Sequence, residues 1–228
     1  KLVDVIKFEK LDVLHVHYAI PHASAAYMAQ HILKSEGINI PFITTLHGTD
    51  ITLVGKDKSF APVITFAINE SNIVTAVSES LKQDTLAHFN VKREIKVIPN
   101  FICFSDYENL GDTSSIRKSF APNNEKILIH VSNFRKVKRV QDVFKVFIKV
   151  NEKIPAKLLL VGDGPERYQL EEFCREQGVC DKVHFLGKLK DTERILSASD
   201  LFLLTSESES FGLAALEAMA AKVPVISS

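Results

Sequence analysis

The sequence has no tryptophan, and none of its apolar runs reaches the length that a membrane-spanning helix needs. Such a helix requires about 18 consecutive apolar residues, so we expect no stable insertion into a membrane. An excess of positive charge is also missing, because 28 Lys and Arg residues balance 28 Asp and Glu residues. A protein that binds nucleic acid through a broad basic surface would carry such an excess, so we expect no nucleic-acid partner.

Cysteine is scarce, and the chain contains only Cys103, Cys174 and Cys180. An odd number does not suit a disulfide framework, and no pair has the two-residue spacing of a zinc knuckle. These residues therefore predict reduced thiols in a cytoplasmic protein, with a redox pair of Cys174 and Cys180 as the weaker alternative. The chain also starts without methionine and stops just after the apolar Val225 and Ile226, which predicts a piece of a longer protein, truncated at both ends.

Hydrophobic residues make up 46% of the 228 residues and charged residues 25%, which is typical of a globular protein with a sizeable core. Short runs of Val, Ile and Leu alternate with longer amphipathic stretches, as in parallel sheets whose strands are buried on both faces. The alternation predicts an α/β fold of doubly wound parallel sheets. The expected strands are residues 12–17, 42–46, 72–77, 95–98, 127–131, 157–161, 183–186, 201–204 and 223–226. The expected helices are residues 24–34, 62–69, 79–89, 139–151, 165–176 and 213–221.

This alternation breaks once, over residues 99–124, where Pro, Asn, Gly, Ser and Asp are frequent and only residues 115–120 look helical. Such a composition is typical of a domain junction. We therefore predict an incomplete N-terminal Rossmann-like domain over residues 1–105, a linker region over 106–124 and an incomplete C-terminal Rossmann-like domain over 125–228.

The acidic segment, residues 207–220, directly follows an expected strand. Ligands of open α/β sheets bind at the carboxyl ends of strands, and Gly212 would open a helix there. The free backbone amides at the start of that helix would point at an anion, helped by the helix dipole. Glu209 and Glu217 would repel an anion, so they better suit the hydroxyl groups of a ribose or a hexose. The plainer alternative is an acidic loop in front of an alanine-rich core helix.

The basic segment, residues 131–139, also directly follows an expected strand and opens a helix. Its cations are Arg135, Lys136, Lys138 and Arg139. Fixed positive charge at this place would stabilise a diphosphate leaving group. A solvated basic loop is the alternative, since most runs of charge are of that kind.

Two shorter motifs stand at other strand ends. In the first, Gly48 allows close approach of the backbone, and His47 could donate to a substrate hydroxyl. A plain capping turn at Thr49 or Asp50 is the alternative. The second motif, residues 162–165, makes a tight turn into a helix but lacks the third glycine of a dinucleotide-binding fingerprint.

Four histidines gather early in the chain, at His15, His17, His22 and His47. The first two share one face of a strand, because side chains alternate with a period of two. A zinc site is conceivable, but no acidic or cysteine ligand has a matching spacing. We therefore favour substrate contacts or core histidines over a metal site.

Together these segments resemble the retaining glycosyltransferases of GT-B architecture, family four. The resemblance rests on the motif Glu209-x-Phe211-Gly212-Leu213, on Glu217-Ala218-Met219-Ala220, and on residues 162–165 with the basic segment upstream. A narrower resemblance over essentially the whole chain is carried by residues 15–23, 45–51 and 130–135. It implies transfer of N-acetylglucosamine from UDP-N-acetylglucosamine to the hydroxyl of L-malate, a step of bacillithiol biosynthesis.

The resemblance also implies roles for single residues. The implied catalytic residues are His47 beside the donor sugar, Arg135 and Lys138 on the leaving diphosphate, and Glu209 on the sugar hydroxyls. The implied nucleotide-sugar contacts are Ser210, Phe211, Gly212, Leu213, Glu217, Gly162 and Gly187. No cofactor or metal is implied, because side-chain cations and a helix N-terminus stabilise the leaving group.

One position departs from the family pattern. Many members have arginine five residues before the lysine that corresponds to Lys138, and this chain has Asn133 there. Arg135 would then act from a different position or serve another purpose. A related transferase with another donor or acceptor, a nucleotide-sugar-binding fragment without activity, and a homo-oligomer all remain open.

Overall fold

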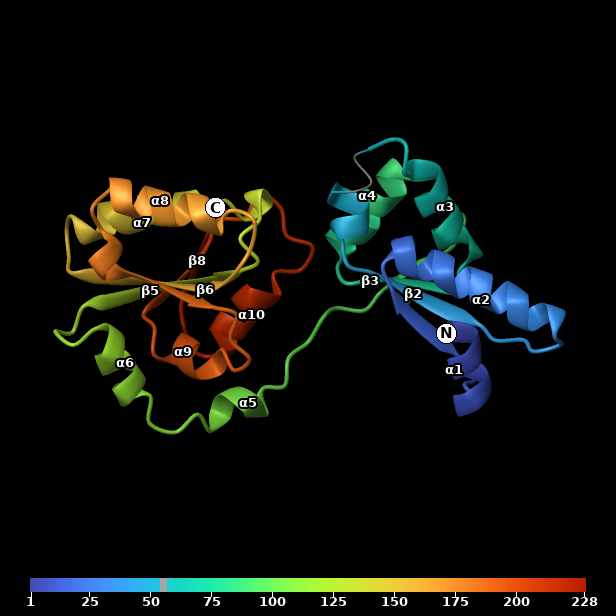
Figure 1. The fold of residues 1–228 in the computed structure, drawn as a ribbon, viewed down its shortest axis with the longest axis horizontal. Coiled ribbons are helices and arrows are strands. Elements are labelled where there is room, and N and C mark those ends of the chain that lie inside the picture. The colour runs from blue at the N-terminus through green and yellow to red at the C-terminus, as the bar shows by residue number, and fades with distance from the viewer. Residues whose placement is uncertain (54–56) are drawn as a thin grey trace. The chain divides into compact units, whose positions relative to one another are not determined.

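The computed structural model describes residues 1–53 and 57–228 and divides the chain into two compact units (Figure 1). Unit 1 is Lys1–Asn100 and unit 2 is Phe101–Ser228. Each unit has its own sheet, and the paired strands run parallel throughout. The predicted α/β class with parallel sheets is therefore confirmed.

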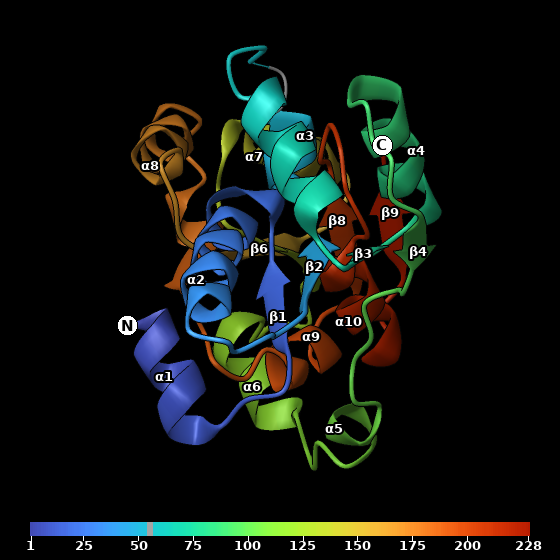
Figure 2. The ribbon, with the colours of Figure 1, turned by 90° about the vertical axis from the view of Figure 1, so that its right-hand side faces the viewer.

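Unit 1 contains a four-stranded sheet in the order β1-β2-β3-β4, which is also the chain order. Its strands are β1 (Leu14–His17), β2 (Phe42–Leu46), β3 (Ile73–Ala76) and β4 (Ile95–Val97). Its helices are α1 (Leu2–Glu9), α2 (Ser24–Ser35), α3 (Ala61–Glu70) and α4 (Glu79–His88), with π-helical segments η1 (Ala19–Ala23) and η2 (Thr49–Leu53). α2 and α3 contact each other and lie side by side in Figure 2.

Unit 2 contains a five-stranded sheet in the order β7-β6-β5-β8-β9. Its strands are β5 (Lys126–Ser132), β6 (Ala156–Gly162), β7 (Val183–Gly187), β8 (Leu201–Leu204) and β9 (Val225–Ser227). Its helices are α5 (Ser105–Glu108), α6 (Ser114–Phe120), α7 (Val140–Asn151), α8 (Arg167–Glu176), α9 (Glu193–Ser197) and α10 (Leu213–Ala220), with 3-10 turns η4 (Lys136–Lys138) and η5 (Cys180–Lys182). Every expected strand and long helix is present, whereas α1, α5 and α9 were not expected from the sequence.

The unit 2 sheet is buried on both faces, as its continuous apolar strands predict. On β6, Leu158 and Leu160 join one core cluster with residues of α7 and α8. The intervening Leu159 and Val161 join a second cluster with residues of α10. Figure 1 shows α7 and α8 on one side of this sheet and α6, α9 and α10 on the other. The central strands are thereby fixed in the middle layer of a three-layer sandwich.

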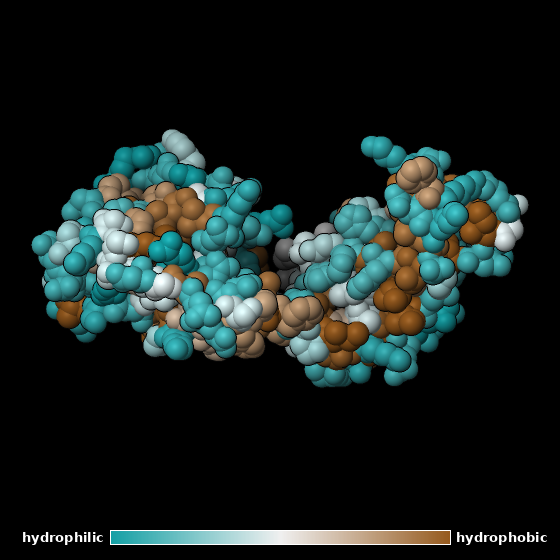
Figure 3. Space-filling view, turned by 90° about the horizontal axis from the view of Figure 1, so that it is seen from below, coloured by the Kyte–Doolittle hydropathy of each residue, from teal (hydrophilic) through white to brown (hydrophobic). Residues whose placement is uncertain are grey.

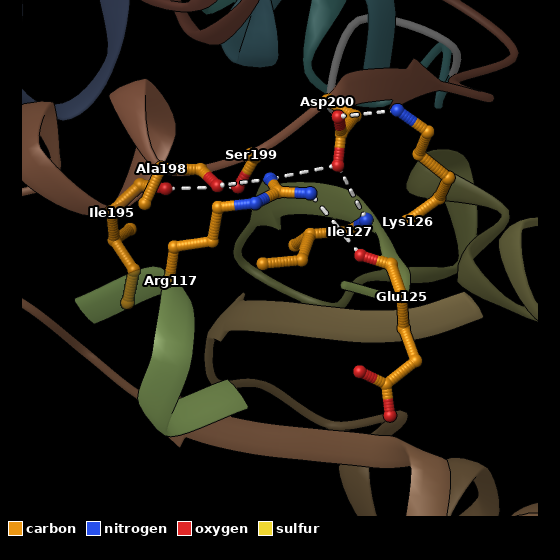
Figure 4. Close-up of polar contacts among 8 residues, drawn as sticks. All are labelled: Arg117, Glu125, Lys126, Ile127, Ile195, Ala198, Ser199 and Asp200. Carbon is orange, nitrogen blue, oxygen red and sulfur yellow. Dashed lines mark hydrogen bonds and ion pairs between the residues drawn. The ribbon is translucent and has the colours of Figure 1, made fainter. Parts of the chain in front are cut away.

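Helix α6, which falls within the predicted linker region, is attached to unit 2 by Arg117 (Figure 4). Its guanidinium donates to the carbonyl oxygens of Ala198 at 3.0 Å and Glu125 at 3.2 Å. It also pairs with Asp200 at 2.9 Å, whose carboxylate accepts the N–H of Ile127 at 2.8 Å. The network therefore joins α6, the start of β5 and the turn before β8.

The surface of unit 1 includes large apolar side chains. Phe8 is 84% exposed, and Met28 and Ile32 on α2 are more than half exposed. Figure 3 shows brown apolar areas among the teal polar ones on one face of the molecule. Within residues 1–53 and 57–228, no helix combines the length and apolar composition that crossing a bilayer requires.

Candidate active site

The topology of unit 2 creates a site at the carboxyl ends of β5 and β8. The chain runs outward from β5 to β6 and β7, and then returns to place β8 on the other side of β5. At such a switch point the connections leave on opposite faces of the sheet and open a crevice where ligands bind. The basic segment follows β5 and the acidic segment follows β8, so both lie at this switch point.

Hydrogen bonds hold these two segments together. The buried Thr205 hydroxyl shares its proton between the carbonyl oxygens of Lys138, at 2.9 Å, and Arg139, at 3.1 Å. The backbone N–H of Glu207 donates to the carbonyl oxygen of Val137 at 2.8 Å. Backbone groups that would otherwise lack partners at two strand ends are thus satisfied.

An ion pair joins two of the predicted catalytic residues. Lys138 Nζ lies 2.6 Å from Glu209 Oε1, and the two side chains are only 21% and 25% exposed. Reduced contact with water strengthens such a pair relative to one on an open surface. The ammonium keeps further protons for a ligand, and the carboxylate keeps acceptor positions. The structure therefore places one cation and one acceptor together at the switch point.

Arg135 lies apart from this pair. Its side chain is exposed, and within the described part of the chain it makes no hydrogen bond or ion pair. Its backbone carbonyl accepts the N–H of Lys138 at 2.8 Å and so starts the η4 turn. The structure thus does not bring Arg135 together with Lys138 and Glu209.

The start of α10 depends on Gly212. This residue has φ +82°, a conformation that glycine adopts without steric cost. An added Cβ would meet nothing within 4 Å, so the backbone conformation and not the available space requires glycine. Ser210 and Phe211 are half-buried, and Leu213 is exposed. The first N–H groups of α10 have no acceptor within the helix, which makes this end suitable for an anion.

Glu217 lies in a different environment from Glu209. Burial raises the pKa of its carboxyl, and repulsion by Glu193 of α9 raises it further. Tyr107 of α5 interacts electrostatically with both carboxylates. Burial, together with the negative charges of Glu217 and Glu193, raises the pKa of Tyr107 to about 12. Nothing in the sequence pattern pointed to Tyr107 or Glu193. Gly187 ends β7 with φ +67° and has open space around it.

Two glycines of the turn after β6 lie against the end of β5. A Cβ on Gly162, which has φ +124°, would lie 1.7 Å from the carbonyl oxygen of Ser132. A Cβ on Gly164 would lie 1.9 Å from the carbonyl oxygen of Asn133. The backbones approach so closely that no larger residue fits. These glycines therefore set the position of the basic segment by backbone contact.

His130 on β5 lies next to the site, and the sequence pattern assigned it no role of its own. It is fully buried, with Nδ1 2.8 Å from the carbonyl oxygen of Leu203 and Nε2 2.8 Å from Ser132 Oγ. Burial lowers its pKa to about 4, so the ring is neutral at physiological pH. Because it stands within an apolar strand sequence, only the hydrogen bonds to distant residues reveal its importance.

In unit 1, the histidine cluster comprises His15, His17, His22 and His47. His17 Nδ1 lies 2.7 Å from His47 Nε2, and His22 Nδ1 lies 2.5 Å from the carbonyl oxygen of His17. His15 Nε2 lies 2.8 Å from Thr45 Oγ1. Burial and the neighbouring histidines lower the pKa of His17 and of His47. Three or more metal-ligating side chains in a metal-binding arrangement are not found among residues 1–53 and 57–228.

Asp50 joins the two loops that carry this cluster. Its carboxylate is 2% exposed and accepts the backbone N–H of Ala19 at 2.5 Å. The contact ties η2, which follows β2, to η1, which follows β1. His47 thus sits at the carboxyl end of the unit 1 sheet, while Lys138 and Glu209 belong to unit 2.

Comparison with protein families covers both units. Residues 112–228 match the model of glycosyl transferases group 1, and residues 1–105 match that of glycosyltransferase family 4. The chain belongs to the group 1 glycosyltransferase family. The solved structure of Anabaena Alr3699/HepE in complex with UDP-glucose shares its fold, with a TM-score of 0.85 at 22% identity over 99% of this chain and 61% of that one. The predicted GT-B class is therefore confirmed for this group 1 glycosyltransferase.

Two curated relatives of this group 1 glycosyltransferase match over nearly its whole length. It is 48% identical over 227 residues to the N-acetyl-alpha-D-glucosaminyl L-malate synthase of Bacillus anthracis. It is 31% identical over 238 residues to an uncharacterized glycosyltransferase of Methanocaldococcus jannaschii. Each match covers 99% of this chain, which spans 58% and 60% of the two relatives.

Proposed function

We propose that the whole protein transfers N-acetylglucosamine from UDP-N-acetylglucosamine to the hydroxyl of L-malate, with retention of the anomeric configuration. The observation that carries this proposal is the 48% identity over 227 residues with the B. anthracis L-malate synthase. The ion pair at the switch point supports it, because the pair offers both a cation for a diphosphate and a carboxylate for hydroxyls. We propose unit 2 as the donor side and unit 1 as the acceptor side.

The donor roles follow from charge and position. Departure of UDP builds negative charge on the diphosphate, and fixed cations stabilise that charge most when water is excluded. Lys138 would supply this charge, and Arg135 would reach in from the exposed part of the basic segment. The amides of Phe211, Gly212 and Leu213 would face the diphosphate or the sugar.

The two glutamates would bind hydroxyl groups. Glu209 would accept hydrogen bonds from the donor sugar and exchange part of its contact with Lys138 for them. Glu217 would accept from the uridine ribose, and such donors would stabilise the carboxylate, whose pKa is raised by burial and by repulsion from Glu193. Gly162 and Gly187 would act through backbone position beside the nucleotide.

His47 would lie beside the donor sugar and act as a neutral imidazole, since its pKa is lowered from the usual histidine value. In the family, retention implies attack from the side of the leaving group, and a diphosphate oxygen would then accept the proton of the malate hydroxyl. The sugar–phosphate C–O bond breaks, the bond from C1 to the malate oxygen forms, and UDP leaves with the proton. A cytoplasmic location and a homo-oligomer remain predictions.

The test uses the full-length protein with UDP-N-acetylglucosamine, with and without L-malate and with and without a chelator. Mass spectrometry should detect a malate-dependent glycoside that still forms with the chelator, and NMR of the product should show the retained anomer. UDP binding without product would reject malate as the acceptor. Failure to bind UDP would reject the proposal altogether.

Site variants sharpen this test. Glu209→Ala and Lys138→Ala should each lower kcat/KM more than tenfold, or about 1.4 kcal/mol or more. Lys145→Ala is the matched control, because it removes only an exposed ion pair of 2.8 Å with Asp142. Near-normal rates in both site variants would contradict the assigned roles.

A further inference from the structure

The hydrogen bonds that His130 makes form a network in which each donor and each acceptor can be assigned. The carbonyl oxygen of Leu203 can only accept, so Nδ1 of His130 must carry the proton. The ring is neutral, so Nε2 is unprotonated and accepts the hydroxyl proton of Ser132. The Ser132 oxygen then accepts the backbone N–H of Phe134 at 3.3 Å. Every donor and acceptor in this buried network is matched.

The network of hydrogen bonds ends at the turn where β5 becomes the basic segment. Phe134 is fully buried and has φ +37°, an uncommon conformation for a bulky residue. Its carbonyl oxygen accepts the N–H of Glu166 at 3.0 Å, and Gly164 lies against Asn133. The turn is therefore held from both sides, four residues before Lys138.

Burying a histidine at this position costs the desolvation free energy of two ring nitrogens, which its hydrogen bonds must offset. It stands between Ile129 and Val131 in a strand whose other buried residues are apolar. An apolar side chain would pack there without the desolvation cost of two ring nitrogens. Fully satisfied polar networks in a core instead favour one defined arrangement of the groups that they join. Here those groups are the backbone of β8 and the turn before Lys138.

We propose that His130 and Ser132 are positioning residues that fix the turn 132–134 and thereby hold Lys138 against the diphosphate of the nucleotide. The proposal rests on the proposed donor function of unit 2. Neither side chain needs to touch the ligand, because both act through the path of the backbone. Hydrogen-bond partners that orient metal ligands typically change affinity or activity by about 10- to 100-fold when removed, and we expect an effect of that order here.

The main test is Ser132→Ala in the full-length protein, with UDP as the probe in calorimetry. This change leaves no large cavity but leaves Nε2 of His130 without a donor, so the variant should melt at a lower temperature than the wild type, and binding is measured well below the melting temperature of the variant. We expect UDP affinity and kcat each to fall about tenfold, with KM for malate unchanged. Ser132→Thr keeps the hydroxyl and should restore both values to within about threefold.

Two histidine substitutions provide a matched pair. His130→Asn should weaken UDP binding, whereas His184→Asn should leave it unchanged. His184 lies on β7 and packs against Phe120 of α6, with ring centres 5.2 Å apart. In nitrogen-15 NMR of the wild type, His130 should show a protonated Nδ1 and an unprotonated Nε2, with the Nε2 signal shifted in Ser132→Ala.

The outcomes separate this inference from the proposed function. If the wild type does not bind UDP, the proposed function fails. If the wild type binds UDP and Ser132→Ala binds it equally well, the positioning role alone is refuted. A protonated Nε2 on His130 would refute it too, because the hydroxyl of Ser132 would then have no acceptor there. Loss of binding that Ser132→Thr does not rescue would also count against it.

Discussion

Replacing Gly164 by alanine should destabilise unit 2 much more than replacing Gly178 by alanine. An added Cβ can destabilise a protein through backbone strain or through steric overlap, and each of these two glycines tests one of the two effects. At Gly178, φ is +65° and nothing lies within 4 Å, so only the backbone conformation is strained. At Gly164 no unusual φ is involved, but the Cβ would lie 1.9 Å from the carbonyl oxygen of Asn133.

The structure sets the size of each effect. Real Cβ contacts essentially never fall below 3.0 Å, so Gly164→Ala must push two backbones apart by about 1 Å. Overpacking of this kind costs up to about 3 kcal/mol, and neither backbone has a flexible side chain that could yield. The left-handed conformation at Gly178 costs an alanine about 1 kcal/mol. Gly162→Ala combines both costs and should be the most harmful of the three.

The assay is thermal unfolding of the full-length variants, followed by UDP calorimetry on those that fold. At about 3 °C per kcal/mol, Gly164→Ala should melt about 9 °C below the wild type and Gly178→Ala about 3 °C below it. The added Cβ of Gly164→Ala would push the backbone of Asn133 away and thereby displace the basic segment. Gly164→Ala should therefore also bind UDP more weakly, and Gly178→Ala should not. Equal melting shifts for the two variants would refute the reasoning.

Two further predictions concern stability. Arg117→Ala should lower the free energy of unfolding by about 1–3 kcal/mol in denaturant titration, because it removes two hydrogen bonds to carbonyl oxygens and the pair with Asp200. Its exposed neighbour provides the control Lys118→Ala, and an equal loss there would contradict the role of the network. His130 has a pKa of about 4 when folded and 6.5 as its ordinary value, so the unfolded state binds the proton first as pH falls. Stability should therefore drop between pH 6.5 and 4 by up to about 1.4 kcal/mol per pH unit, and a His130→Asn variant that shows the same slope would disprove this.

The central strands of unit 2 were predictable because they are buried on both faces. The apolar run at Leu158–Val161, for example, directly predicts β6, and its flanking glycine predicts where the strand ends. Helices of four or five residues, such as α5 and α9, are too short to show a helical period. Helix α6 was seen only as a helical patch, because its attachment through Arg117 depends on residues far along the chain.

The site was predictable only in part. Lys138 and Glu209 were found because each follows a strand, but local patterns do not say that β5 and β8 become neighbours. The roles of His130 and Thr205 depend on backbone carbonyls more than 60 residues away, so no local pattern reveals them. The exposed position of Arg135 also depends on how the η4 turn directs the chain.

The position of β8 beside β5 determines when the sheet of unit 2 can be completed during synthesis of the chain. Lys138 and Glu209 are 71 residues apart, and the ribosome adds about 5–20 residues per second. On the order of 4 to 14 seconds therefore pass between the synthesis of the lysine and that of its partner. During this interval β5 can pair with β6 but has an open edge where β8 will later bind. The pairing of Lys138 with Glu209 therefore forms only after β8 has been made, and the arrival of β8 also covers the open edge of β5.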